Sequence, residues 1–273
     1  FKLKDAVTLS SETTGTIRGN LMLSLDGGAL TVSKGNYTAD SITLGSGSLS
    51  IGNGGTSDAT LTVNGNVVLG AADTSAITVS GNNSTLDISK GSVSYAAGND
   101  AKATTFVASG SNSSIKISTE SLAGLMRAKA ADSGAQFNLS GANTTLVAVG
   151  DGEITLKAGQ LGSGAFGTSP TGHNGISLSG ANSKFSTDGT LKIDLGSEKE
   201  FSLASATVSA TEGRKISAGK LELVTTATDA LSLKSGDFTV ANGLSTPNGL
   251  TVSGANAILT LGSFTEVEKA EGQ

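Results

Sequence analysis

The 273-residue sequence contains no cysteine, no tryptophan and only two prolines, and aromatic residues make up 4% of it. Without cysteine the chain has no disulfide framework and no thiolate metal site. The scarcity of aromatic residues argues against a bulky core, so the apolar residues are expected to pack in thin layers of small and medium side chains. Charged residues are also few, at 15%, compared with about a quarter in typical globular chains.

Glycine (38 residues) and hydrophobic residues (37%) are plentiful, and the net charge is −5. Disordered chains combine low hydrophobicity with high net charge, so this composition argues against disorder. The acidic balance gives no reason to expect nucleic acid as a partner, and no apolar run approaches the roughly 18–20 residues that insert across a bilayer. The start at Phe1, without an initiator Met or signal peptide, indicates that residues 1–273 are one segment of a larger or processed protein.

Short runs of alternating apolar and polar residues dominate the chain, as in ALTVSKG (29–35), TLTVNGN (60–66) and TLKIDLG (190–196). Each run has the length of an ordinary strand, and Gly, Asn, Ser or Asp residues separate the runs. Roughly 25 such runs, about one in every ten or eleven residues, predict an all-β fold. The outward positions of these runs are mostly Thr, Ser, Asn, Lys and Asp, which indicates a compact polar surface.

One phrase returns five times with the frame apolar-x-apolar-Ser-Gly-x-Asn-x-x-apolar. The copies are ITVSGNNSTLDIS (77–89), FVASGSNSSIKIS (106–118), FNLSGANTTLVAV (137–149), ISLSGANSKFSTD (176–188) and LTVSGANAILTLG (250–262). The intervals between successive copies are unequal, and the last is the longest. A phrase that returns every few tens of residues indicates a solenoid, a propeller or an array. The uneven spacing favours a coil whose turns stack while loops of different length leave its corners.

The Ser-Gly-x-Asn element predicts a tight corner between two strands. Glycine adopts positive φ without steric cost, and Asn tolerates the left-handed region while its side chain bonds locally. If the turns stack, the Asn amides are expected to form a ladder along the coil. The predicted corner residues are Gly81, Asn83, Gly110, Asn112, Gly141, Asn143, Gly180, Asn182, Gly254 and Asn256.

Two stretches interrupt the alternation. SLAGLMRAKAAD (121–132) places Leu122, Leu125 and Met126 on one side, which predicts a short helix on the flank of the coil. AGQLGSGAFGTSPTGHNG (158–175) has no charged residue and many glycines, which predicts a loop that leaves the coil. Because the repeated phrase predicts scaffold, these interruptions are the first places to look for function.

Motifs for catalysis or for cofactor and metal binding are poorly supported. The GxGxxG match at 162–167 lacks the following helix that a dinucleotide site needs. The single histidine, His173, lies in the same Gly-rich stretch with no patterned partner, and the segment 52–58 resembles a calcium-binding nonapeptide that is not repeated in tandem. Asp87, Asp188 and Asp194 lie on or beside predicted strands and fit a solvated face better than a glycan-cleaving pair. No cofactor, metal site or catalytic residue is therefore predicted.

The Ser-Gly-Ala-Asn corners, with phrases such as NSTLDISKGSVS (83–94) and GALTVSKGNYTADSITLGSGSLSIGNG (28–54), resemble autotransporter passenger domains and related haemagglutinin-like surface proteins of Gram-negative bacteria. The resemblance is one of style and spans roughly residues 5–263. It implies a right-handed parallel β-helix that is displayed outside the cell as a stalk or adhesive surface. The translocating barrel of that family has no counterpart in this sequence.

We therefore expect one elongated, single-stranded parallel β-helix (β-solenoid) with three strands per turn. The expected role is a non-enzymatic stalk or adhesive segment on the bacterial cell surface, with a host or bacterial surface protein or glycan, or other copies of the chain, as partner. Two alternatives stay open at this point. One is a self-assembling surface-layer or fibre subunit, because open coil ends expose strand edges. The other is a β-helix that binds or cleaves polysaccharide.

Overall fold

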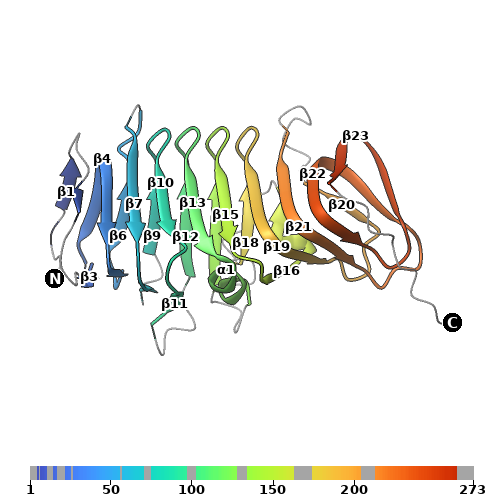
Figure 1. Cartoon of the computed structure of the whole chain (residues 1–273), viewed down its shortest axis with the longest axis horizontal. Coiled ribbons are helices and arrows are strands. Elements are labelled where there is room, and N and C mark those ends of the chain that lie inside the picture. Colours follow the sequence, from blue (N-terminus) through green and yellow to red (C-terminus); the bar gives the residue numbers. More distant parts are fainter. Residues whose placement is uncertain are drawn as a thin grey trace.

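The computed structural model describes residues 5, 7–10, 15–16, 22–25, 27–55, 57–70, 75–96, 103–127, 134–162, 174–203 and 213–262. These ranges contain strands β1 to β23, one α-helix and one short 3-10 helix, η1 (Ala158–Gln160), so the all-β prediction is confirmed. Every strand pairing within them is parallel. The strands stack along one long axis, with β1 at one end and β23 at the other (Figure 1). This arrangement is consistent with a β-solenoid.

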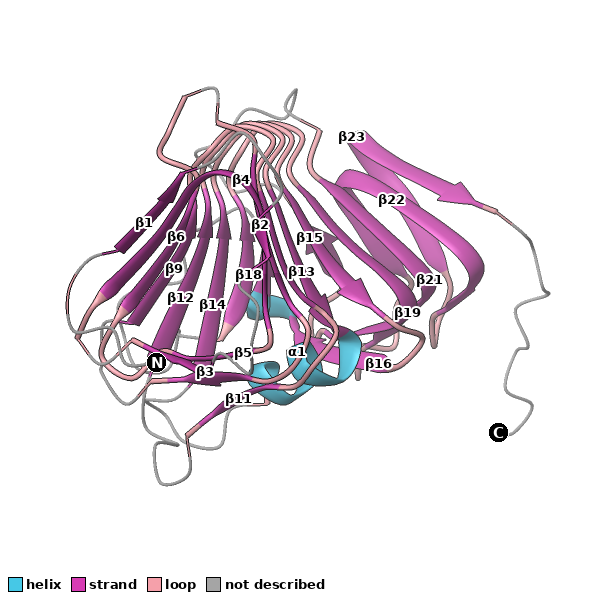
Figure 2. Cartoon of the chain, turned by 60° about the vertical axis from the view of Figure 1, so that its left-hand side comes forward, coloured by secondary structure: helices cyan, strands magenta, loops and turns pink. Residues whose placement is uncertain are grey.

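The strands form three faces around a shared interior (Figure 2). Face 1 begins with β1 (Val7–Ser10), the start of β4 (Ala29–Ala39), β6 (Ser48–Ile51), β9 (Ser75–Val79), β12 (Ala103–Ala108), β14 (Gly134–Leu139), β18 (Gly175–Leu178) and β17 (Leu161–Gly162). Towards the C-terminus it is formed by β20 (Glu200–Ser202) and the starts of β22 (Leu231–Ser245) and β23 (Leu250–Leu261).

Face 2 follows face 1 in each turn. It contains β2 (Gly15–Thr16), the end of β4, β7 (Ala59–Val63), β10 (Thr85–Ile88), β13 (Ser114–Ser118), β15 (Thr145–Val149), the starts of β19 (Lys184–Asp194) and β21 (Lys215–Val224), and later parts of β22 and β23. Face 3 contains β3 (Met22–Ser24), β5 (Ser41–Thr43), β8 (Val67–Leu69) and β11 (Val93–Tyr95), then helix α1 (Thr119–Met126), then β16 (Glu153–Lys157) and the ends of β19, β21 and β22.

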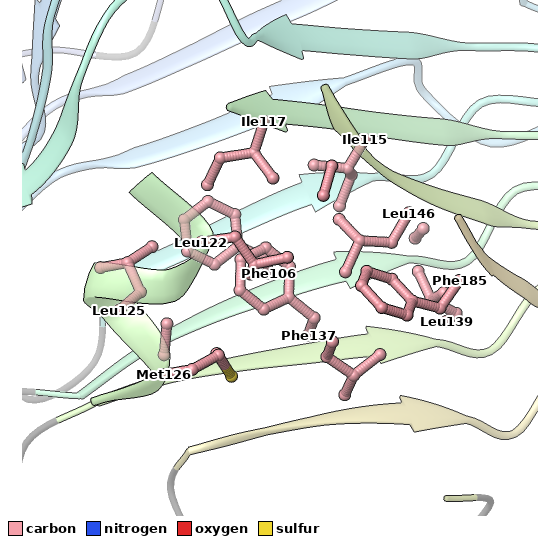
Figure 3. Close-up of a cluster of buried hydrophobic side chains, with 14 of the residues drawn as sticks. Phe106, Ile115, Ile117, Leu122, Leu125, Met126, Phe137, Leu139, Leu146 and Phe185 are labelled. Atoms are coloured by element: carbon pink, nitrogen blue, oxygen red, sulfur yellow. The ribbon is translucent and has the colours of Figure 1, made fainter. Parts of the chain in front are cut away.

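The alternation in the sequence sends every second side chain inward, and the parallel register stacks these side chains in columns. On face 1 the column runs through the fully buried residues Leu30, Leu49, Ile77, Phe106, Phe137 and Ile176. Phe106 and Phe137 stack with ring centroids 4.5 Å apart (Figure 3). The few phenylalanines are thus used inside: Phe106, Phe137, Phe185 and Phe238 are among the largest fully buried side chains.

The face-1 column of inward residues is kept while the length of each turn varies. On face 1, Leu30 pairs with Leu49 and Phe137 pairs with Ile176, although the second of these turns is about twice as long as the first. The longer turn does not shift the column of inward residues. This explains the uneven spacing of the repeated phrase.

The segment 158–175 is only in part a loop. Its first residues form η1 and β17, and Leu161 of β17 pairs with Ile176 of β18. The prediction of a loop is therefore wrong for residues 158–162, because Leu161 is buried and extends face 1. Residues 163–173, which hold most of the GxGxxG match and His173, lie outside the described residues.

Candidate functional site

The first four copies of the repeated phrase form one column of corners. Asn83, Asn112, Asn143 and Asn182 all have a left-handed backbone, with φ of 55°, 56°, 56° and 54°. Nδ2 of Asn112 donates to Oδ1 of Asn83, and Nδ2 of Asn143 donates to Oδ1 of Asn112, each at 3.1 Å. At the N-terminal end of this ladder, Nδ2 of Asn83 donates to a carboxylate oxygen of Asp58 at 3.1 Å. The amide of Asn83, at this end of the ladder, therefore donates to a carboxylate.

The glycine of each corner has a different role from the predicted one. Gly81, Gly110, Gly141 and Gly180 are not among the residues with positive φ, so the prediction that glycine supplies the left-handed turn is wrong. A Cβ at Gly110 would lie 2.2 Å from the carbonyl oxygen of Gly81, and one at Gly180 would lie 2.0 Å from that of Gly141. Glycine is needed because adjacent turns of backbone approach too closely for any side chain.

The fifth copy of the phrase does not form such a corner. Gly254 and Asn256 lie inside strand β23, and Asn256 pairs with Ser235 of β22. β23 still passes from face 1 to face 2 at this place, and a Cβ on Gly254 would clash with the Lys234 carbonyl oxygen. What is wrong there is the predicted role of Asn256, which lacks the left-handed backbone of the other four asparagines. The amide-to-amide hydrogen bonds run from Asn83 to Asn143. Beyond Asn182 the next turn places Gly213, where a Cβ would lie 2.9 Å from Oδ1 of Asn182.

Helix α1 follows directly from β13 at the predicted place but begins two residues earlier. Oγ of Ser118 caps it by accepting a hydrogen bond from the Ser121 N–H at 3.2 Å. Leu122, Leu125 and Met126 are buried in the common core (Figure 3). The helix ends at Met126, and residues 128–133 lie outside the described part of the chain.

The helix takes the place of a face-3 strand between β11 and β16, so it is more integral to the coil than a helix on its flank. The edge of β11 and the turn before β16 meet side chains of α1 in place of a strand. Oγ of Ser121 accepts from the Val93 N–H at 2.9 Å, and Oγ1 of Thr119 donates to the Gly150 carbonyl at 2.9 Å. These contacts satisfy backbone groups that a strand ladder would otherwise satisfy.

Two shallow grooves flank α1. One, of about 640 Å³, lies between α1 and the turn that leads into β16, and Asp151 and Glu153 line it. The other, of about 470 Å³, lies between α1 and the turn before β11, and Lys90 lines it. Glu120 and Gly124 border both grooves, so the grooves meet over the outer side of the helix. This interruption gives the coil a contoured surface at the level of α1.

Gly124 lies at the centre of this surface without a packing reason. It is exposed, and a Cβ built on it would meet no atom within 4 Å. Glycine inside a helix costs about 1 kcal/mol relative to alanine. Because Gly124 has no side chain, the outer surface of the helix is depressed between the two grooves. Glu120 and Arg127 are exposed on either side of it along the helix.

The carboxylates weighed in the sequence have local roles. An oxygen of Asp87 accepts from the N–H and the hydroxyl of Ser89, at 3.1 and 2.6 Å. An oxygen of Asp194 accepts from the Gly196 N–H at 2.9 Å, and Asp188 is exposed beside the corner at Gly189. Among the described residues, no cluster of His, Cys, Asp or Glu has the geometry to hold a metal ion, and no helix there has the length and apolarity to cross a bilayer.

Comparison with known proteins gives no relative. No protein-family model, curated protein or solved structure matches this chain.

Proposed function

We propose that this chain is a right-handed parallel β-solenoid that serves as a rigid, non-enzymatic stalk and adhesive segment of a bacterial surface protein, like the passenger domains it resembles. The observation that carries the proposal is the unbroken parallel pairing of face 2 from β4 to β23. Backbone hydrogen bonds along the axis resist stretching and bending, and that property suits a spacer better than a flexible hinge.

The outer surface supports the adhesive part of the proposal. Thr, Ser and Asn side chains dominate the outward positions, and these neutral groups can hydrogen-bond to a ligand at a lower desolvation cost than charged groups. The α1 surface, formed by Glu120, Gly124 and Arg127 with the two flanking grooves, adds relief and charges of both signs to this flat coil. We propose that it contacts a protein or glycan ligand on a host or bacterial surface, outside the cell that displays the chain.

Display on a non-adherent laboratory bacterium tests this function. The chain is fused to an outer-membrane anchor, and attachment is measured to cultured cells, to matrix proteins and on a glycan array. We expect attachment that is lost in Gly124→Arg, because the arginine fills the low part of the α1 surface without a clash. Thr239→Arg, which changes an exposed threonine on face 2, is the matched control and is expected to attach normally.

Three results count against the proposal. If the chain attaches to none of the tested surfaces, the adhesive role is wrong. If both variants attach equally well, the α1 surface does not take part in adhesion. Release of shorter sugars from any glycan on the array would overturn the non-enzymatic assignment and favour the polysaccharide-cleaving alternative.

A further inference from the structure

The last described strand presents an open edge. β23 pairs with β22 on one side, and no strand pairs with its other side within the described ranges. Its inward residues extend buried columns: Val252 follows Leu233, and Leu259 follows Phe238. Leu233 and Phe238 are 0% exposed, whereas Val252 is 44% exposed. Within the described residues, no further strand covers this column.

This edge lacks the usual protection against pairing. Residues 250–262 contain no charged residue and no proline, although natural edge strands normally carry lysine, proline or a covering element. Two of the four large hydrophobic residues that are exposed in the described part of the chain lie on β23, namely Val252 and Ile258 (56% exposed). The edge is therefore suited to accept another strand.

The opposite end of the molecule offers a matching strand. β1 also lies on face 1 and pairs with β4 on one side only within the described residues. Val7 and Leu9 are half-buried and Thr8 is exposed. The pattern Val-Thr-Leu of β1 therefore matches the pattern Leu-Thr-Val at residues 250–252 of β23.

The two ends also match in size. The turn from Val7 to Leu30 at one end and the turn from Leu231 to Leu250 at the other are both short. The turn from Phe137 to Ile176 in the middle of the coil is much longer than either. Neither β1 nor β23 brings a charge to the edge.

We propose that β23 of one molecule pairs in parallel with β1 of a second copy of this chain, so that the coils stack head to tail. In the register that continues the face-1 columns, Val7 lies opposite Leu250, Thr8 opposite Thr251, and Leu9 opposite Val252. Every inward residue then meets an inward residue, as in all other turns. This inference uses only the strand edges and goes beyond the proposed function, which does not depend on it.

A symmetric pair of two β23 edges fits less well. Its strands would run antiparallel. β23 consists of two paired parts of unequal length, residues 250–252 and 256–261, separated by a register shift. In an antiparallel pair, only one of these parts could pair at a time. A head-to-tail contact uses different surfaces on the two partners and does not close, so it produces chains of increasing length.

Sedimentation of the purified chain over a range of concentrations is the first test. We expect the mass to rise with concentration, and Val252→Lys to raise the concentration of half-association at least about tenfold, because it places a charge on the open edge. Val149→Lys is the matched control, since Val149 is 40% exposed on β15 in the middle of the coil. A chain that stays monomeric, or a control that weakens association equally, overturns the proposal.

Cysteine cross-linking tests the register, and the absence of native cysteine makes it clean. In oxidised mixtures, Thr8→Cys and Thr251→Cys are expected to form a heterodimer, because paired strands bring Cα atoms within disulfide range. Thr8→Cys with Thr239→Cys is the control and should give only background cross-linking. A dominant homodimer of Thr251→Cys would overturn the parallel arrangement. Circular dichroism of each variant checks that the coil is folded. The proposed function is tested separately, in the attachment assay.

Discussion

The asparagine ladder allows the contribution of one corner to be calculated. Asn112 is the central member: its side chain donates to Asn83 and accepts from Asn143, and its backbone φ is 56°. Exposed hydrogen bonds contribute at the low end of about 0.5–1.5 kcal/mol each, so the two bonds amount to about 1 kcal/mol. Alanine in a left-handed conformation costs roughly 1–2 kcal/mol in addition, a cost that glycine avoids.

We therefore expect Asn112→Gly to lower the free energy of unfolding by about 1 kcal/mol and Asn112→Ala to lower it by about 2 kcal/mol. Urea unfolding followed by circular dichroism measures both values. Because stacked turns can unfold in parts, hydrogen exchange at the corner amides is the accompanying local probe. Asn53→Ala, at an exposed asparagine without positive φ, is the control and should change stability by less than about 0.5 kcal/mol.

Two results would refute this reasoning. If alanine is tolerated better than glycine at position 112, the left-handed backbone is not the main cost. If Asn112→Gly and Asn143→Gly add fully in the double variant, the two amides do not share a hydrogen bond, because shared partners produce non-additive effects.

Three further substitutions and one titration test other parts of the structure. Gly110→Ala should destabilise the chain by more than about 2 kcal/mol in urea unfolding, because its Cβ would lie 2.2 Å from the Gly81 carbonyl oxygen; a neutral effect would contradict the close approach of turns. Gly124→Ala should instead stabilise it by about 0.5–1 kcal/mol, since the new methyl group enters open space, and a loss of stability would show that the helix surface is more crowded. Leu122→Ala should cost about 2–5 kcal/mol by leaving a cavity under α1, and a cost under about 1 kcal/mol would place α1 outside the core. Burial raises the pKa of the Tyr95 phenol above the ordinary value of 10.0, so the folded state holds this proton more tightly than the unfolded state. The stability that results is present below about pH 10 and is lost as the pH rises through the pKa of the folded state. Tyr95→Phe should remove that part of the alkaline loss of stability in thermal melting between about pH 8 and pH 11. An unchanged pH profile would contradict the raised pKa of this half-buried phenol.

The sequence was sufficient to predict the strands and most corners, because both depend on local pattern. Alternation at Leu30 and Val32 assigns the inward face without knowledge of the neighbours. The reason for Gly110 could not be predicted, since it depends on how closely the preceding turn approaches. Asn256 was misassigned for the same reason: an amide ladder needs an asparagine in the adjacent turn, and local sequence does not show which residue lies there.

The helix shows the same division between local and non-local information. Leu122, Leu125 and Met126 predicted a helix with one apolar side, and the side chains are buried as that pattern requires. Its position inside face 3 could not be predicted, because it depends on Val93 and on the turn at Gly150, both far away in the sequence. The two flanking grooves follow from that position and were likewise missed.

Replacement of one strand by α1 makes the rod mechanically uneven. Beside the helix, faces 1 and 2 remain continuous, through the pairing of β12 with β14 and of β13 with β15. Face 3 is connected there by side chains of Thr119 and Ser121. A bending load that opens face 3 therefore meets its least resistance at α1. Within the described residues, face 3 is therefore more compliant at the level of α1 than where its strands pair directly, and this compliance has a preferred direction.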